Sequence, residues 1–253
     1  MTAITTAGVV LIGNELLTGK IRDENGTYLI EQMRRRGIDL AEMHMVSDDL
    51  DAIVEVVNLV RGRRDICITS GGIGPTHDDV TMDAIAAAFS MKLERRPELV
   101  EMIEMVFGSD ETGRAWQKMA DVPTGTVMIP VETGWPVYSV ENVYALPGIP
   151  QIFRRQVDKL LESVGGERVR TNMVFFKIGE GELAGPLTEL AADFDTIVDV
   201  GSYPVLGDND YQVKVTLDSR DPDALESATR WLMAAFPAEC IHESAINGKR
   251  SAG

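Results

Sequence analysis

The sequence predicts a three-layer α/β/α fold around a mostly parallel sheet, followed by a smaller α/β domain. Short apolar runs alternate with amphipathic stretches from residue 4 to residue 161. Repeated strand–helix–strand units form a parallel sheet with right-handed crossovers and helices on both faces. Gly165-Gly166 interrupts this rhythm, and the order beyond it is strand, helix, strand, strand, helix. We therefore expect a first domain at 1–165, a small open-faced α/β sandwich at 166–243 and a disordered tail at 244–253.

Each element of the first domain follows from its local pattern. The run at 4–12 is apolar nearly throughout, as expected for a strand covered on both faces. Asp48 is predicted to cap a helix, and Pro97 and Pro150 are predicted to open two more. The stretch 109–136 is predicted to be mostly loop, with a short helix near Trp116. In chain order, the other predicted elements are a helix at 25–36 that Gly37 ends, strands at 38–46 and 66–69, a helix at 83–89 and a strand at 142–146.

The second domain has a different spacing of apolar residues. The run at 211–217 alternates, so that Val213, Val215 and Leu217 are predicted to face inward and Thr216 outward. Asp221-Pro222 is predicted to open the last helix. The remaining predicted elements are strands at 169–178 and 196–200 and a helix at 182–192.

Charge and cysteine content limit the possible functions. The net charge is −16, from 40 acidic and 24 basic residues, which disfavours binding to nucleic acid or to an anionic membrane. A small anionic ligand is still possible, because backbone amides or a metal ion can override the global field. The two cysteines, Cys67 and Cys240, lie far apart, and no apolar run is long enough to span a bilayer. We therefore expect a cytoplasmic protein.

The stretch SGGIGPTHDDVT at 70–81 follows a short buried strand, at the edge where parallel sheets bind ligands. Gly71, Gly72 and Gly74 leave backbone N–H groups uncovered, as a phosphate-binding loop requires. Their spacing matches neither a dinucleotide fingerprint nor a Walker loop. The other candidate contacts in this stretch are Ser70, Pro75, which stiffens the loop, and the hydroxyl residues Thr76 and Thr81.

Two carboxylates stand beside this predicted anion site. Carboxylates next to a phosphate repel it unless a cation lies between them, so Asp78 and Asp79 indicate Mg²⁺ or another divalent ion. A simpler interpretation is a glycine-rich turn whose aspartates cap the next helix. Composition alone favours the simpler interpretation, and both stay open at this point.

A second polar loop, GNELLTG at 13–19, begins where the first strand ends. Gly13 allows a sharp turn, and Asn14 and Glu15 place an amide and a carboxylate at the same edge of the sheet. By itself, Glu15 is better explained as a solvated loop charge.

Four stretches together resemble the molybdopterin-binding-domain superfamily. Within it, they resemble the N-terminal region of competence/damage-inducible protein A (CinA) and, more closely, the corresponding domain of eukaryotic FAD synthases. The stretches follow one another in the order of these families, from residue 4 to about residue 236. They are GNELLTGKIRDENGTYL at 13–29, SGGIGPTHDDVT at 70–81, SVENVYALPGIP at 139–150 and IGEGELAGPLTEL at 178–190.

The resemblance implies the molybdopterin-binding-domain fold and a pocket for a phosphate-bearing pterin or nucleotide. The pocket is implied between the loops at 13–15 and 70–83 and the loop of Pro147 and Gly148. It also implies a divalent ion such as Mg²⁺, with Asp79 at the metal. The second domain is similar to the unit that in such relatives accompanies metal-dependent pyrophosphatases acting on ADP-ribose or FAD.

The leading hypothesis is therefore a divalent-metal-dependent pyrophosphatase that cleaves the diphosphate of a nucleotide such as ADP-ribose or FAD. Asp79 and Asp78 are assigned to the metal, and Glu15 or Asp78 to the base, between which the residues do not decide. The alternatives are a non-catalytic molybdopterin- or nucleotide-binding protein and a molybdopterin adenylyltransferase. A homo-oligomer, dimer or trimer, is also implied. The predicted ligand contacts are Gly13, Asn14, Asn25, Ser70, Gly71, Gly72, Gly74, Pro75, Thr76, Thr81, Pro147 and Gly148.

Overall fold

Two compact units make up the chain, Met1–Gly166 and Glu167–Gly253. Each has a buried core of its own. The predicted tail at 244–253 lies outside the residues whose structure is described. The computed structural model describes residues 5–132, 134–162, 164, 167–207 and 210–241.

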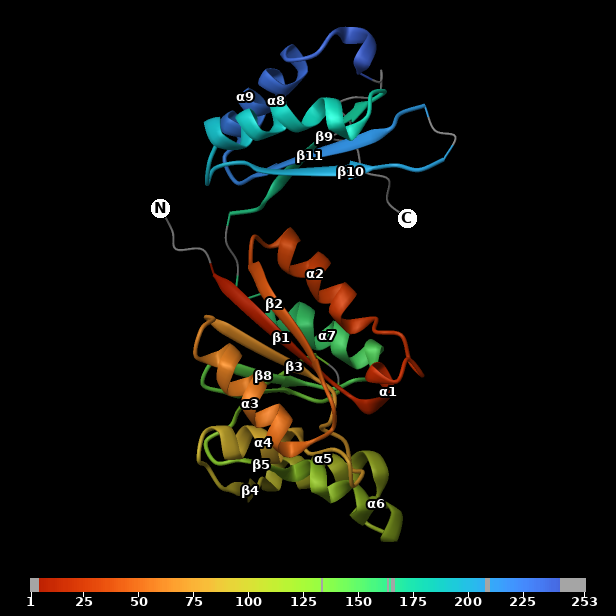
Figure 1. Ribbon diagram of the computed structural model, residues 1–253. Helices are drawn as coiled ribbons and strands as arrows, with labels where there is room; N and C mark the ends of the chain where they lie inside the picture. Colours follow the sequence, from red (N-terminus) through yellow and green to blue (C-terminus); the bar gives the residue numbers. More distant parts are fainter. Residues whose placement is uncertain (1–4, 133, 163, 165–166, 208–209, 242–253) are drawn as a thin grey trace. The chain divides into compact units, whose positions relative to one another are not determined.

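The first unit is built on a six-stranded sheet with the strand order β2-β1-β3-β8-β7-β6. The part β2-β1-β3-β8 can be followed in Figure 1. The first four strands in this order are parallel, and β7 and β6 add an antiparallel edge. The central strand β3 is buried along its whole length, because it has neighbours on both edges and helices on both faces. The strands are β1 (Thr6–Ile12), β2 (Asp39–Val46), β3 (Ile66–Ser70), β6 (Val127–Ile129), β7 (Val137–Val140) and β8 (Val143–Leu146).

Helices cover both faces of this sheet, which confirms the predicted three-layer fold. Figure 1 shows α2 and α7 on one side of the sheet and α3 and α4 on the other. Leu29, Met33 and Phe153 fill the core on the first side, and Ile53 and Ile103 belong to the core on the second. The helices are α1 (Asn14–Leu17), α2 (Asn25–Arg35), α3 (Leu50–Arg61), α4 (Thr81–Ala88), α5 (Pro97–Phe107), α6 (Glu111–Trp116), the 3-10 helix η1 (Gln117–Ala120) and α7 (Pro150–Leu160).

Two helix starts differ from the prediction. The cap of α3 is Asp49, whose side chain accepts a hydrogen bond from the Ala52 amide at 2.9 Å. Asp48 instead accepts from the Asn14 amide at 2.8 Å, so the predicted cap was wrong by one residue. Either of two consecutive aspartates fits the capping pattern of the sequence. Which one caps the helix depends on the residue at which the helix begins. Helix α4 begins at Thr81, two residues before the prediction.

Replacing Asp49 with alanine should lower the free energy of unfolding by about 1 kcal/mol, because the first turn of α3 loses its capping acceptor. Urea denaturation measures this loss. Asp51→Ala is the matched control, because Asp51 is an acidic residue in the same first turn that does not cap it. An equal loss in both variants would contradict the assignment of the cap.

The stretch 109–136 contains more regular structure than predicted. Besides α6 and η1, it forms β5 (Asp121–Pro123), which pairs antiparallel with β4 (Leu93–Arg95), and it continues into β6. Strands of three residues are too short to show a period in the sequence. The rings of Phe107 and Trp116 stack at 3.9 Å between centroids and hold α6 against α5.

The second unit is a three-stranded antiparallel sheet in the order β10-β11-β9, with α8 and α9 packed on one face, as an open-faced sandwich requires. Six of its predicted boundaries move by two to four residues, and the largest shift is at the strand predicted at 196–200. No helix in the described part of the chain is long and apolar enough to cross a membrane. The elements are β9 (Arg170–Phe176), α8 (Glu180–Asp193), β10 (Asp199–Pro204), β11 (Val213–Ser219), α9 (Pro222–Ala234) and the 3-10 helix η2 (Ala238–Cys240).

The inward residues of β11 are confirmed; Thr216 faces the other way, as predicted, but it is buried as well. The cause lies on the neighbouring strand. A Cβ added to Gly201 would lie 2.9 Å from both the Thr216 hydroxyl oxygen and the Tyr203 ring. Tyr203 therefore lies across the glycine and covers Thr216 on the face that the helices leave open.

Candidate functional site

The glycine loop begins directly at the end of β3. Gly71 (φ 106°) and Gly72 (φ 66°) take conformations with positive φ, and the Gly71 amide donates to the carbonyl of Leu146 at 3.0 Å. Within the described residues, no acceptor receives the amides of Gly72, Ile73 and Gly74. Consecutive N–H groups that lack an acceptor are the kind of donor that anion-binding loops provide.

Close packing explains why glycine stands at these positions. A Cβ on Gly71 would lie 2.2 Å from the carbonyl oxygen of Ile12 on β1, and a Cβ on Gly72 would lie 2.3 Å from the Thr81 hydroxyl. Thr81 also fastens the loop to α4, because its amide donates to the Gly72 carbonyl and its hydroxyl to the Gly71 carbonyl, both at 2.9 Å. Thr81 is thus a structural anchor of the loop.

An acidic turn follows the glycines. The Thr76 hydroxyl lies 2.6 Å from Asp78 Oδ1 and 2.5 Å from Asp79 Oδ2, although it has only one hydrogen to donate. Asp79 Oδ2 also accepts from the Thr76 amide at 2.8 Å. The hydrogen bond with Thr76, more than the nearby charges of His77 and Lys118, holds the pKa of Asp78 below its usual value. Asp78 is therefore a carboxylate at neutral pH.

These aspartates do not cap α4. The residue at the cap position is Val80, and no side chain accepts a capping hydrogen bond there. The simpler interpretation of the sequence, a glycine-rich turn with an aspartate cap, is therefore wrong in its second part. Asp79 closes its own turn back to Thr76 and also prevents any side chain at Gly74, since a Cβ there would lie 2.7 Å from its Oδ2.

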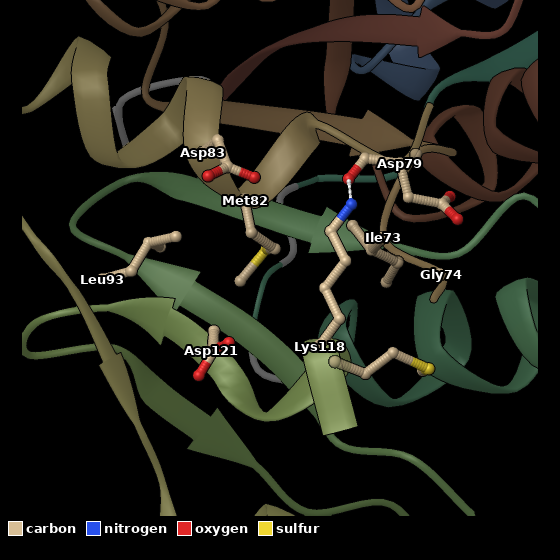
Figure 2. A pocket seen from close by; sticks show the side chains of 10 residues that line it. Ile73, Gly74, Asp79, Met82, Asp83, Leu93, Lys118 and Asp121 are labelled. Carbon is tan, nitrogen blue, oxygen red and sulfur yellow. Dashed lines mark hydrogen bonds between the residues drawn. The ribbon is translucent and has the colours of Figure 1, made fainter. Parts of the chain in front are cut away.

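Lys118 of η1 holds the acidic turn from the other side and was not predicted. Its ammonium group donates to the carbonyl oxygens of Thr76 and Asp79, each at 2.7 Å. Figure 2 shows the lysine stem rising to the turn. Beside it lies a cavity of about 150 Å³. The cavity is lined by Gly72, Ile73, Gly74, Asp79, Met82, Asp83, Leu93, Lys118, Met119 and Asp121.

Replacing Lys118 with methionine should loosen the acidic turn, because two carbonyl oxygens lose a charged donor while the length of the stem is kept. We expect the Asp79 amide, which donates to the Thr76 carbonyl, to exchange hydrogen about tenfold faster. Amide hydrogen exchange followed by mass spectrometry or NMR measures this. Lys118→Arg, which keeps a cationic donor, should restore most of the protection; unchanged exchange in Lys118→Met would exclude this role.

The glycine loop also contacts two other predicted loops. The side-chain amide of Asn25 donates to the Ser70 hydroxyl oxygen at 3.0 Å and to the Gly148 carbonyl at 2.9 Å. The Ser70 hydroxyl donates to the carbonyl of Pro147 at 3.4 Å. A Cβ on Gly148 would lie 3.6 Å from the Gly71 Cα. The structure thus brings these predicted residues together, with Asn25 as the link between them.

The loop at 13–19 contributes differently from the prediction. Glu15 stands on the short helix α1 and folds back toward Gly13, where an added Cβ would lie 2.5 Å from its carboxylate. Within the described residues, the Glu15 side chain makes no hydrogen bond or ion pair. Asp48, at the end of β2, fixes the start of α1 through the Asn14 amide and is a further carboxylate at this edge.

The oxygen atoms of the acidic turn fit a hard divalent cation. Among the described residues there is no group of three or more His, Cys, Asp or Glu side chains placed to hold a metal. Two carboxylates and one hydroxyl oxygen nevertheless converge at Thr76, and a single hydroxyl hydrogen cannot serve both carboxylates. Mg²⁺ is commonly held by one or two carboxylates together with substrate phosphates and water.

The first unit matches a known protein family. Residues 8–165 match the family model described as a probable molybdopterin binding domain. The chain belongs to this family. Residues 168–245 match a second model, described as the middle domain of FAD synthase, so that the molybdopterin-binding domain is followed here by the FAD-synthase type of second unit.

Two of the relatives are named as a FAD synthase and as a CinA-like protein, the two families that the sequence motifs resemble. A probable FAD synthase of Caenorhabditis elegans is 30% identical over 94% of this chain and 51% of its own length. A CinA-like protein of Syntrophus aciditrophicus is 36% identical over 59% of this chain. A protein of Archaeoglobus fulgidus is 30% identical over 88% of this chain and 94% of its own length. The chain thus spans about half the length of the FAD synthase relative.

Among solved structures, CinA of Thermoplasma acidophilum resembles this molybdopterin-binding-domain protein. It is 27% identical, with a TM-score of 0.56, and the match covers 63% of this chain and 95% of that one. The predicted resemblance to CinA and to FAD synthases is therefore confirmed, and a ligand related to nucleotides or pterins follows from these families.

Proposed function

We propose that this protein is a divalent-metal-dependent pyrophosphatase that cleaves the diphosphate of a nucleotide. The observation that carries the proposal is the run of unpaired amides at Gly72, Ile73 and Gly74, which ends beside the carboxylates of Asp78 and Asp79. The amides suit a phosphate, and the carboxylates suit a cation next to it. ADP-ribose and FAD are the candidate substrates.

The residues of the chain then have distinct tasks. The amide run holds one phosphate of the diphosphate and accommodates negative charge that develops on it. A water oxygen forms a bond to a phosphorus atom, the bridging P–O bond breaks, and its electron pair goes to the leaving phosphate. Asp78, whose lowered pKa keeps it ionised, or Glu15 accepts the proton of that water. Asp79 and Asp78 would hold the divalent ion, which would neutralise charge on the diphosphate and favour ionisation of the water.

The position of Glu15 favours Asp78 as the base. Asp78 belongs to the acidic turn itself, whereas Glu15 folds back toward Gly13. FAD is among the candidate substrates because one relative is named a probable FAD synthase, and FAD contains a diphosphate bridge. The cytoplasmic location and the homo-oligomer stay predictions.

A panel of substrates tests the proposal directly. Purified protein is incubated with ADP-ribose, FAD or NADH in the presence of Mg²⁺, Mn²⁺ or Co²⁺, and AMP release is measured by chromatography. We expect AMP from at least one substrate and loss of the activity in EDTA. Absence of AMP with every substrate and metal would refute hydrolysis.

A second candidate is a protein that binds a nucleotide or pterin without turnover. It is favoured because the described residues contain no group of three or more His, Cys, Asp or Glu side chains placed to hold a metal ion. Calorimetry distinguishes the two, since this candidate predicts tight binding in the absence of any AMP release.

A further inference from the structure

The cavity in Figure 2 is bordered on one side by the glycine loop, so it lies next to the proposed phosphate site. Gly72 and Gly74, which carry two of the three unpaired amides, form part of its lining. A phosphate held on those amides therefore has the cavity beside it. Whatever group is bonded to that phosphate is within reach of the cavity.

The walls of the cavity are of two kinds. Ile73, Met82, Leu93 and Met119 give it apolar surfaces, and carboxylates of Asp83 and Asp121 stand at its edge. A ligand that suits such walls has apolar faces and hydrogen-bond donors around its rim. A sugar ring has this distribution, with C–H groups on its faces and hydroxyl groups at its edge.

The two carboxylates are not equivalent. Asp121 is engaged by Arg95, whose guanidinium donates to its two oxygens at 2.8 and 2.7 Å. Asp83, on α4, makes no side-chain hydrogen bond or ion pair within the described residues. The Asp83 carboxylate is therefore the acceptor that is available to hydroxyl groups of a ligand.

The volume limits the size of the occupant. A cavity of about 150 Å³ accommodates a single small ring such as benzene. A fused three-ring system such as a flavin would extend well outside it. The chemical group bonded directly to a phosphate in a nucleotide is its sugar, so position, wall chemistry and volume all favour the same occupant.

We infer that this cavity is a subsite for the sugar ring attached to the bound phosphate, with Asp83 accepting hydrogen bonds from the sugar hydroxyls. The inference rests on the phosphate site of the proposed function. If the subsite exists, the site binds the phosphate of a single-ring sugar more tightly than it binds a phosphate without a sugar.

Calorimetry on the full chain with Mg²⁺ tests the subsite with three probes: inorganic phosphate, phenyl phosphate and ribose 5-phosphate. We expect ribose 5-phosphate to bind about tenfold more tightly than inorganic phosphate, because its hydroxyls donate to a charged acceptor. Phenyl phosphate has a ring but no donors and should lack most of this advantage. Equal affinities for ribose 5-phosphate and inorganic phosphate would overturn the inference.

Two variants separate the cavity from the phosphate site. Asp83→Ala removes the acceptor and Leu93→Trp fills the cavity; each should abolish the advantage of ribose 5-phosphate and leave the affinity for inorganic phosphate unchanged. Asp51→Ala is the matched control, because Asp51 is an acidic residue in the first turn of α3, outside the cavity. If the advantage persists in both cavity variants, the subsite is excluded.

The binding experiment and the hydrolysis assay test the subsite and the proposed function separately. AMP release by the wild-type chain together with a persistent advantage in Asp83→Ala and Leu93→Trp would exclude the subsite and leave the proposed function standing. An advantage that depends on Asp83, with no AMP from any nucleotide, would support the subsite and refute hydrolysis.

Discussion

Gly71→Ala is expected to destabilise the first unit by more than about 4 kcal/mol, the range of the most severe single substitutions. The added Cβ would lie 2.2 Å from the carbonyl oxygen of Ile12, which is backbone of the neighbouring strand β1. That carbonyl cannot rotate away as a side chain can, so β1 and the end of β3 must separate. The positive φ of 106° adds the strain that any residue with a Cβ has in this conformation.

Gly125→Ala provides the matched control for this effect. Gly125 also has a positive φ, of 83°, but a Cβ there would meet nothing within 4 Å. It should therefore show the backbone strain alone, about 1–2 kcal/mol. Urea denaturation gives both free energies of unfolding, and if Gly71→Ala is not recovered as soluble protein, the comparison of soluble yield with Gly125→Ala serves instead. Equal losses in the two variants would show that the close approach of the glycine loop to β1 is not required.

The parts of this site that the sequence could predict lie within one continuous stretch. Gly71, Gly72 and Gly74 follow a buried strand, and a loop at the carboxyl end of a parallel strand is a place where ligands bind. The backbone conformation of the loop determines which amides stay unpaired. Glycine is the residue that readily adopts positive φ, so the positions of the glycines indicate that conformation. For this reason the glycine loop was predicted correctly in its position.

The parts that the sequence could not predict depend on segments that meet only in the folded chain. Lys118 reaches the acidic turn from η1, some forty residues further along the chain. It belongs to a stretch of short elements without a measurable period, and nothing near it in the sequence indicates what its ammonium group contacts. The cavity has the same origin, since the paired strands β4 and β5 bring Leu93 and Asp121 to the cavity that the glycine loop borders.

Asp48 illustrates a different limit. The sequence Asp48-Asp49 contains a carboxylate that caps α3 and a carboxylate that fixes the start of α1. Both roles need the same chemical group, an oxygen acceptor aimed at a backbone amide. Neighbouring side chains of an extended chain point in opposite directions, so Asp48 and Asp49 reach different amides. The sequence does not show which of the two points toward α3.

Asp79→Asn is the substitution with the largest expected effect on activity. The asparagine keeps an oxygen that can accept from the Thr76 amide at the same position, so the acidic turn should stay closed. It loses the negative charge that the proposed divalent ion needs. If the ion contributes as much as a single preorganised electrostatic group does in other enzymes, turnover should fall by about 10²–10³-fold. The free energy of unfolding should change by no more than about 1 kcal/mol.

The dependence of AMP release on Mg²⁺ concentration decides what the lost charge does. A weakened metal site shifts the half-saturating concentration upward, and high Mg²⁺ then recovers part of the turnover. Thr76→Val is the informative companion, because it removes the hydroxyl between the two carboxylates but keeps both charges. It should reduce activity less than Asp79→Asn if the charge matters most. Turnover within a few-fold of wild type in Asp79→Asn, in a chain that hydrolyses its substrate, would remove Asp79 from the metal site and leave it only its structural bond to Thr76.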